Sequence, residues 1–151
     1  MTVPSIYFID SNVLVYAIDP TDKAKQRMAI TLLDTVARLN VGAISAQVLG
    51  ETFNTITRKI DEPVDPRRAA DELLALSRVL TVYPITGQTV RRAFTGVLNY
   101  QMSYWDALIW ATAKLNGIAT ILTEDIQSGG AIEGVSFLNP FTAGFDAASL
   151  A

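Results

Sequence analysis

The sequence contains neither cysteine nor histidine. Without cysteine the chain can form no disulfide, no thiolate metal site and no cysteine nucleophile. Without histidine it has no imidazole to bind a metal or to act as a general acid or base. Any chemistry that the chain performs must therefore use carboxylates, hydroxyls, amides, lysine or arginine.

Long hydrophobic runs are also absent. No run of about 18 apolar residues could span a bilayer, and the start, MTVPSIYFID, lacks the basic segment and the cleavage site of a signal peptide. We therefore expect a cytoplasmic protein with no membrane association. Half of the 151 residues are hydrophobic, which is enough for one core without disulfides. We expect a single domain over residues 1–141 and a C-terminal tail over residues 142–151.

Positive charge is scarce in the C-terminal third of the chain. The formal net charge is −3, and eleven of the twelve lysines and arginines lie between Lys23 and Arg92. Residues 93–151 contain five acidic residues against the single Lys114. This balance argues against a protein that coats nucleic acid passively. Two divalent cations bound to the acidic residues would change the formal charge to about +1 and reverse its sign locally.

Strands and helices are expected to alternate along the chain. Apolar, β-prone segments predict strands over residues 5–9, 41–45, 79–85, 118–122 and 135–140. Apolar residues at helical spacing predict helices over residues 23–39, 45–60, 66–78, 88–100 and 104–116. Thr21 or Asp22 is the expected cap of the first of these helices, and Asp65 with Pro66 starts the third. The alternation predicts an α/β fold, a three-layer sandwich in which helices flank a central, mainly parallel sheet.

Acidic residues follow the predicted strands. Asp10 ends the first strand, Asp125 lies just past the strand IATIL, and Ser45 ends VGAIS with Glu51 less than two turns into the next helix. Asp106 is near the start of its own helix. Because ligands of open parallel sheets bind at the carboxyl ends of the strands, these side chains are expected to converge there.

Each acidic residue also has a purely structural interpretation. Asp106 has the S-x-x-D spacing of a capping box with Ser103, Glu51 could lie at the solvated border of an amphipathic helix, and Asp125 could start a turn. Asp10 is harder to explain in this way, because it interrupts a strand that should be buried. An isolated buried carboxylate costs several kcal/mol unless it is paired or binds a metal.

Four carboxylates without histidine or cysteine would form an all-oxygen site, which favours Mg²⁺ or Mn²⁺ over zinc or copper. A bound divalent ion would relieve the repulsion between the carboxylates and lower the pKa of a bound water. Such a site could deliver hydroxide to a phosphodiester without an imidazole.

Four segments resemble a known family. FIDSNVLVYA, the glutamate of SAQVLGE, YWDALIWA, and LTEDIQSG followed by VSFLNPF are similar to the PIN domain, and most closely to the VapC-type toxins of toxin–antitoxin pairs. The resemblance covers about residues 6–141. It implies a Mg²⁺- or Mn²⁺-dependent endoribonuclease with a central parallel sheet, usually a homodimer, that a small cognate antitoxin inhibits by covering or entering the acidic pocket.

The resemblance also assigns residues. Asp10, Glu51, Asp106 and Asp125 match the acidic quartet of the family, which binds metal and positions the attacking water. Asn12, Ser45 and Thr123 match residues with supporting roles at the site. Ser11 stands where threonine is commoner, and Glu124 could replace Asp125 as a ligand, although the spacing after Thr123 favours Asp125.

Other residues allow two interpretations. The basic pairs Arg58–Lys59, Arg67–Arg68 and Arg91–Arg92 could contact RNA phosphates or could be ordinary solvated helix faces. The aromatic residues Tyr104, Trp105 and Trp110 fit a core or a dimer interface better than base stacking.

Two alternative functions are compatible with acidic residues at strand ends. A receiver-like domain that is phosphorylated on aspartate would need a lysine near the end of its last strands, but the only late lysine, Lys114, lies inside a predicted helix. A PIN-like RNA-binding module without activity would keep the fold, and the presence of all four acidic residues argues against it.

Overall fold

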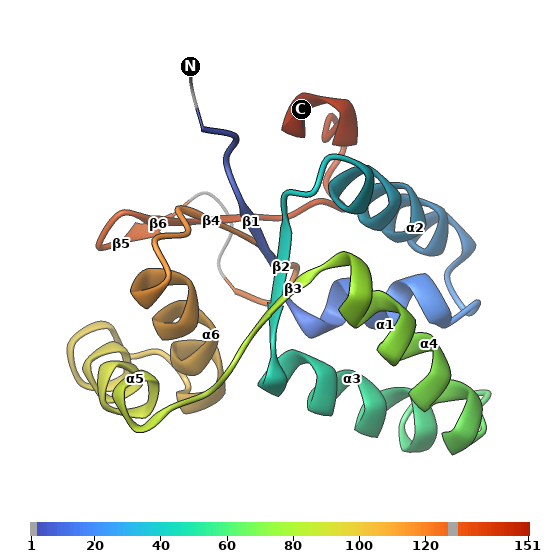
Figure 1. The fold of residues 1–151 in the computed structure, drawn as a ribbon, viewed down its shortest axis with the longest axis horizontal. Coiled ribbons are helices and arrows are strands. Elements are labelled where there is room, and N and C mark those ends of the chain that lie inside the picture. Colours follow the sequence, from blue (N-terminus) through green and yellow to red (C-terminus); the bar gives the residue numbers. More distant parts are fainter. Residues whose placement is uncertain (1–2, 127–129) are drawn as a thin grey trace.

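The computed structural model describes residues 3–126 and 130–151 and shows one sheet flanked by helices (Figure 1). Within these residues the sheet has six strands in the order β3-β2-β1-β4-β6-β5, and every neighbouring pair is parallel except β5 with β6. The strands are β1 (Tyr7–Ile9), β2 (Gly42–Ser45), β3 (Thr81–Tyr83), β4 (Thr120–Leu122), β5 (Ala131–Ile132) and β6 (Val135–Leu138). The predicted α/β class with a mainly parallel sheet is confirmed.

Helices lie on both sides of this sheet. In Figure 1, α1 to α4 lie on one side, and α5 and α6, which pack on each other, lie on the other. The helices are α1 (Ser11–Ile18), α2 (Lys23–Arg38), α3 (Ala46–Arg58), α4 (Pro66–Val79), α5 (Gly87–Tyr100) and α6 (Tyr104–Leu115), with the 3-10 helix η1 (Ala147–Leu150). The expected caps are present, since Asp22 accepts a hydrogen bond from the Lys25 N–H, and Asp65 precedes Pro66.

Three described elements were not predicted. The segment that follows Asp10 forms α1, because Asp10 caps it and accepts a hydrogen bond from the Ser11 N–H. Its eight residues are too few for periodicity to separate a helix from a strand. The two residues of β5 and the single turn of η1 are too short to leave any pattern. The observed strands are also one to four residues shorter than the predicted ones, because the ends of the predicted segments belong to loops.

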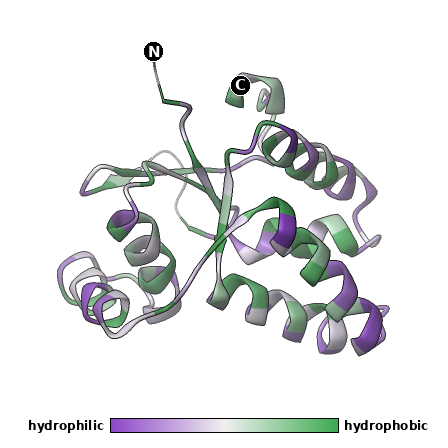
Figure 2. Cartoon of the chain, viewed as in Figure 1, coloured by the Kyte–Doolittle hydropathy of each residue, from purple (hydrophilic) through white to green (hydrophobic). Residues whose placement is uncertain are grey.

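The core lies between the sheet and both helix layers. Phe8 of β1, Ile44 of β2 and Trp110 of α6 are fully buried, and the Trp110 indole N–H donates to the Ile132 carbonyl over 3.0 Å. Figure 2 shows hydrophobic residues along the strands and hydrophilic ones on the outer surfaces of α2 and α4. In the part of the chain that the structure describes, every helix is too short or too polar to cross a membrane.

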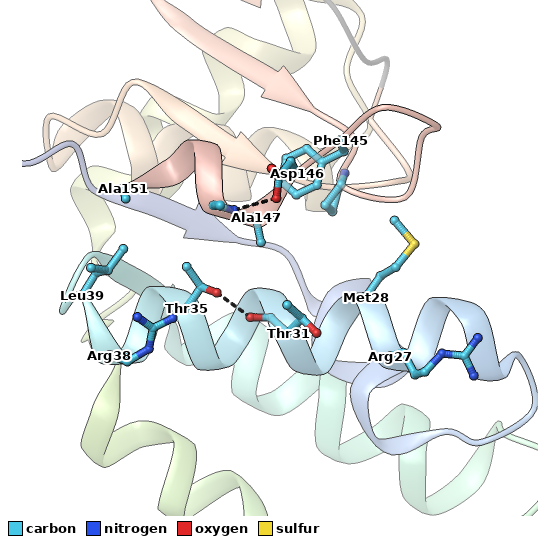
Figure 3. Close-up of a pocket in the computed structure, with 12 residues that line it drawn as sticks. Arg27, Met28, Thr31, Thr35, Arg38, Leu39, Phe145, Asp146, Ala147 and Ala151 are labelled. Carbon is cyan, nitrogen blue, oxygen red and sulfur yellow. Dashed lines mark hydrogen bonds between the residues drawn. The ribbon is translucent and has the colours of Figure 1, made fainter.

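The C-terminal segment packs on α2. Leu150 of η1 is buried. Beside the contact between η1 and α2, residues of both elements line a groove of about 490 Å³. Figure 3 shows Met28 and Leu39 on the α2 side of this groove, and Phe145 on the other. The groove contains none of the four predicted site acids. The division of the chain at residue 141 stays a prediction.

Gly42 sets the distance between the sheet and α2. A Cβ atom at this position would lie 2.6 Å from Leu80 Cδ2 and 2.9 Å from Val36 Cγ2, closer than packed carbon atoms approach. We therefore expect Gly42→Ala to lower the free energy of unfolding by about 1–3 kcal/mol, measured by urea denaturation.

Gly50→Ala is the matched control, because Gly50 is an exposed residue of α3 whose added Cβ would meet nothing within 4 Å. It should stabilise the chain by about 0.5–1 kcal/mol. Equal effects of the two substitutions would contradict the close approach at Gly42.

Candidate active site

Parallel strand pairing gathers the predicted site residues at one edge of the sheet. Ile9 is in register with Leu122, and the Asp10 N–H donates to the Leu122 carbonyl over 3.0 Å. Asp10 and Thr123 therefore leave the ends of adjacent strands, although they are 113 residues apart in the sequence. Ser45 ends β2, the neighbour of β1 on the other side.

Asp10 is a buried carboxylate with several hydrogen bonds. Its side chain accepts from the Ser11 N–H over 2.7 Å, from the Thr123 hydroxyl over 2.7 Å and from the Asn12 amide over 3.2 Å. Burial raises its pKa to about 6, and the nearby charges of Glu51 and Asp125 add to the rise. The hydrogen bonds reduce the cost of burial without removing it.

Asn12 connects Asp10 to Asp125. Its side-chain nitrogen lies 3.2 Å from Asp10 Oδ2, 3.2 Å from Thr123 Oγ1 and 3.1 Å from Asp125 Oδ2. Its side-chain oxygen accepts from the Glu124 N–H over 3.2 Å. Asn12, Thr123 and Asp125 thus form one hydrogen-bonded network with Asp10. The sequence had placed all four residues at the site, Asn12 and Thr123 through the resemblance, and their roles there stay a prediction.

Glu51 reaches this network from α3. The Ser11 hydroxyl lies 3.3 Å from Glu51 Oε2 and 3.4 Å from Asp10 Oδ1, so it bridges the two carboxylates. Glu51 Oε1 is buried and has no hydrogen-bond partner among the described residues. Burial raises the pKa of Glu51, and the charges of Asp106 and Asp125 contribute. A buried carboxylate oxygen without a donor is costly and would be satisfied by a cation or by water.

Asp106 lies in the first turn of α6. Its N–H donates to the Ser103 hydroxyl over 3.2 Å, which is one half of the predicted capping box. Burial raises the pKa of its carboxyl, and the charge of Asp125 adds to this. Asp106 and Asp125 line the same hollow, which has a volume of about 400 Å³.

Two side chains of the site were not singled out by the sequence for the contacts they make. The Gln47 amide donates to the Trp105 carbonyl over 3.1 Å and so ties the start of α3 to the start of α6, which carry Glu51 and Asp106. Ser11 was considered only as a departure from the family motif, whereas its hydroxyl joins Asp10 to Glu51. Contacts between side chains of different helices leave no pattern in the sequence.

Glu124 is directed to other partners. Tyr16 donates its hydroxyl to Glu124 Oε1 over 2.6 Å, and the Lys25 ammonium lies 2.6 Å from Glu124 Oε2. The hydrogen bond to Glu124 raises the pKa of Lys25 to about 12. Of the two adjacent acids, Asp125 is therefore the one whose carboxylate accepts a hydrogen bond from Asn12.

The charges of the four acids act on one another. Glu51 and Asp125 raise the pKa of Asp10, and Asp125 raises the pKa of Asp106. Among residues 3–126 and 130–151, however, no group of three acids is close enough to hold one ion as the side chains stand. The donor set is nevertheless all oxygen, and Glu51 Oε1 lacks a donor, which suits a hard cation such as Mg²⁺. Residues 127–129 of the TEDIQSGG segment lie outside the described residues.

The remaining predicted residues have mostly structural contacts. The Ser45 hydroxyl caps α3 by accepting from the Val48 N–H. Arg68 pairs with Glu72, and Arg92 with Glu133, whereas Trp110 is part of the core. A role of the basic pairs in RNA binding stays a prediction.

The fold and these contacts define an α/β domain with acidic side chains gathered at the carboxyl edge of a parallel sheet. The sequence matches the family model described as the PIN domain over residues 7–127, so the chain belongs to the PIN domain family. This confirms the resemblance found in the sequence.

Several solved structures are similar to this chain. VapC20 of Mycobacterium tuberculosis, described as a sarcin–ricin loop cleaving toxin, is 25% identical, with a TM-score of 0.65 over 84% of this chain and 97% of VapC20. VapBC2 of Rickettsia felis, bound to a promoter DNA fragment, is 20% identical, with a TM-score of 0.64 over 89% and 98%. A toxin–antitoxin complex from Klebsiella pneumoniae is 20% identical, with a TM-score of 0.63 over 91% and 98%. No curated protein matches the sequence.

The raised pKa of Asp10 predicts a pH dependence of stability in the absence of metal. Because the pKa is about 6 in the folded chain and ordinarily 3.8, the folded state retains a proton that the unfolded state releases. This contribution is complete below about pH 4 and is lost as the pH rises through about 6. In EDTA the wild-type chain should lose about 3 kcal/mol relative to Asp10→Asn between about pH 4 and pH 7, measured by urea denaturation.

Asp71→Asn is the control, because Asp71 is exposed on α4. It should keep the pH profile of the wild-type chain. Parallel profiles for wild type and Asp10→Asn would show that the Asp10 carboxyl titrates normally in the folded state.

Proposed function

We propose that the chain is the toxin of a toxin–antitoxin pair and a Mg²⁺-dependent endoribonuclease, with Mn²⁺ as an alternative ion. Asp10, Glu51, Asp106 and Asp125 form its acidic quartet. The observation that carries the proposal is the gathering of these four carboxylates, which come from four separate parts of a PIN domain. Hydrogen bonds through Asn12 and Ser11 join Asp10 to Asp125 and to Glu51, and Asp106 lines the same hollow as Asp125. The similarity to VapC20, described as cleaving the sarcin–ricin loop, supports RNA as the substrate.

The four carboxylates would hold the ion, which supplies positive charge for the phosphate and lowers the pKa of bound water. Asp10 is fixed by the Ser11 N–H and the Thr123 hydroxyl, so its orientation is set before metal binds. The Asn12 amide fixes Asp125 in the same way. Glu51 Oε1 is buried without a hydrogen-bond partner among the described residues, so the ion would compensate it. In the reaction the water oxygen would bond to phosphorus as the bond from phosphorus to a ribose oxygen breaks. The proton of the water would pass to a carboxylate or to solvent, and the leaving ribose oxygen would take up a proton from solvent.

Two protein partners belong to the proposal, a small cognate antitoxin and a second copy of the chain. Toxin–antitoxin complexes among the similar structures support the antitoxin. Phe94, Leu98 and Trp105 are 51%, 77% and 62% exposed on α5 and at the start of α6. Large apolar side chains exposed on two helices that pack together favour a protein interface, and we assign this surface to the homodimer.

The alternatives have less support. The receiver-like domain needs a lysine near the end of its last strands, but the Lys114 ammonium donates to the Glu133 carbonyl over 2.6 Å, and neither residue lines the hollow beside Asp106 and Asp125. A PIN-like module without activity is distinguished from an enzyme by assay alone.

We expect the wild-type chain to cleave RNA with Mg²⁺ or Mn²⁺ and not with EDTA. Asp10→Asn, Glu51→Gln and Asp106→Asn should each lower the cleavage rate at least about 100-fold, because each removes a negative ligand from the cation. The measurement is cleavage of labelled RNA, together with circular dichroism and thermal melting of each variant.

Asp71→Asn serves as the control for loss of an exposed acid and should cleave RNA at the wild-type rate. Loss of fold in Asp10→Asn would support a structural role for that residue. No cleavage by the wild-type chain, and no change in its melting with Mg²⁺ or Mn²⁺, would support the binding module instead.

The antitoxin proposal predicts a small gene immediately upstream that overlaps the gene of this chain. Its product, co-expressed with this chain, should co-purify with it and inhibit RNA cleavage, because an antitoxin at the acidic pocket excludes the substrate. Size-exclusion chromatography and the cleavage assay are the measurements. Cleavage that is unaffected by the co-purified protein would contradict this proposal.

A further inference from the structure

Two acidic residues follow Thr123 in succession, and each could occupy the acidic cluster. The contacts that select between Glu124 and Asp125 come from α1 and α2, not from the cluster itself. Tyr16 of α1 and Lys25 of α2 each contact one carboxylate oxygen of Glu124 at 2.6 Å. Lys25 is 99 residues away from Glu124 in the sequence.

Two aromatic rings lie beside the ammonium of Lys25. The Lys25 ammonium lies 3.2 Å from the Tyr16 hydroxyl, 4.8 Å from the centre of the Tyr16 ring and 5.8 Å from that of Phe141. The two rings meet edge to face, with their centres 4.9 Å apart. Side-chain exposure is 32% for Lys25 and 22% for Glu124, so the ion pair is partly shielded from solvent. Such a pair is less screened by salt than a fully exposed one.

The backbone of Glu124 connects the contacts with Tyr16 and Lys25 to the acidic site. Its N–H donates to Asn12 Oδ1 over 3.2 Å, so the oxygen of the Asn12 amide faces Glu124. The amide nitrogen then faces Asp10 Oδ2 and Asp125 Oδ2, at 3.2 and 3.1 Å. A reversed amide would place its oxygen against two carboxylates and its nitrogen against an N–H, which is unfavourable on both sides.

We propose that Tyr16 and Lys25 are positioning residues of the acidic site. By holding the Glu124 carboxylate outside the cluster, they present Asp125 to it and fix the orientation of the Asn12 amide. Without this attachment Glu124 would be free to approach the cluster as a fifth carboxylate, and the Thr123–Asp125 turn would lose one of its anchors. The consequence for RNA cleavage rests on the proposed function, whereas the consequence for Asn12 and Asp125 does not.

Lys25→Met is the first test, because methionine keeps most of the length of the side chain without its charge. In the metal-free protein, the Asn12 side-chain amide resonances should shift in a ¹⁵N correlation spectrum. The dissociation constant for Mn²⁺, measured by calorimetry without RNA, should rise about 10-fold, and the cleavage rate at saturating RNA should fall about 10-fold to 100-fold.

Several variants separate positioning from general effects. Lys25→Arg should restore most of the metal affinity and the wild-type Asn12 resonances. Tyr16→Phe removes a single hydroxyl donor and should give a smaller change in the same direction. Lys23→Met is the matched control, because Lys23 is an exposed lysine of the same helix turn whose ammonium makes no ion pair in the described part of the chain. It should resemble the wild type in all three measurements.

A double variant tests the route through Glu124. Lys25→Met combined with Glu124→Gln should bind Mn²⁺ no more weakly than Lys25→Met alone, because both substitutions remove the same interaction. Additive losses would show that Lys25 acts on the site by another route and would overturn the proposal.

Two further results would also overturn it. One is that Lys25→Met has the same metal affinity and the same Asn12 resonances as the control Lys23→Met, whatever its melting temperature. The other is a Lys25→Arg variant whose metal affinity is as low as that of a folded Lys25→Met variant. If the wild-type chain neither binds metal nor cleaves RNA, the proposed function fails, and the Asn12 resonances still decide the positioning role.

Discussion

The buried carboxylate of Asp10, at the end of the central strand β1, is the constraint on which the rest of the site depends. A negative charge at this depth is unfavourable, and the chain compensates for it with donors from the residues around it. Ser11 and Asn12 supply two of these donors, and Thr123 supplies the third from the neighbouring strand. The parallel pairing of β1 with β4 is therefore both the centre of the sheet and the origin of the acidic site.

The same carboxylate has a structural function, because it caps α1 and lies at the positive end of that helix. The capping interaction lowers the pKa of Asp10, but burial and the neighbouring acids raise it by more. Hydrogen bonds alone thus do not compensate the buried charge of Asp10 in full. Burial also raises the pKa of Glu51 and of Asp106. Three carboxyls with raised pKa at one sheet edge suit a region built to receive positive charge.

Most of the architecture was predictable from local patterns. Five of the strands and five of the helices were expected, because apolar residues at a period of two or of 3.6 extend over enough residues to be recognised. The helix α1 was missed, since a short apolar run after Asp10 has no clear period, although its cap was visible as the acidic residue that ends the strand. The position of Asp10, Asp125 and Thr123 at one edge followed from the parallel sheet, because the carboxyl ends of its strands meet.

The sequence by itself determined the class of fold and the absence of imidazole and thiol chemistry, and its resemblance to the PIN domain predicted the four acids with Asn12 in a supporting role. The spacing after Thr123 favoured Asp125 over Glu124, but it gave no contact that would keep Glu124 away from the site. Only the tertiary structure shows that contact, since Tyr16 and Lys25 lie on two other helices and reach Glu124 through space. The contact between Ser11 and Glu51 was equally invisible, because the packing of α1 against α3 brings them together. Periodicity reports which way a side chain faces, whereas the partner that it meets depends on how the elements pack.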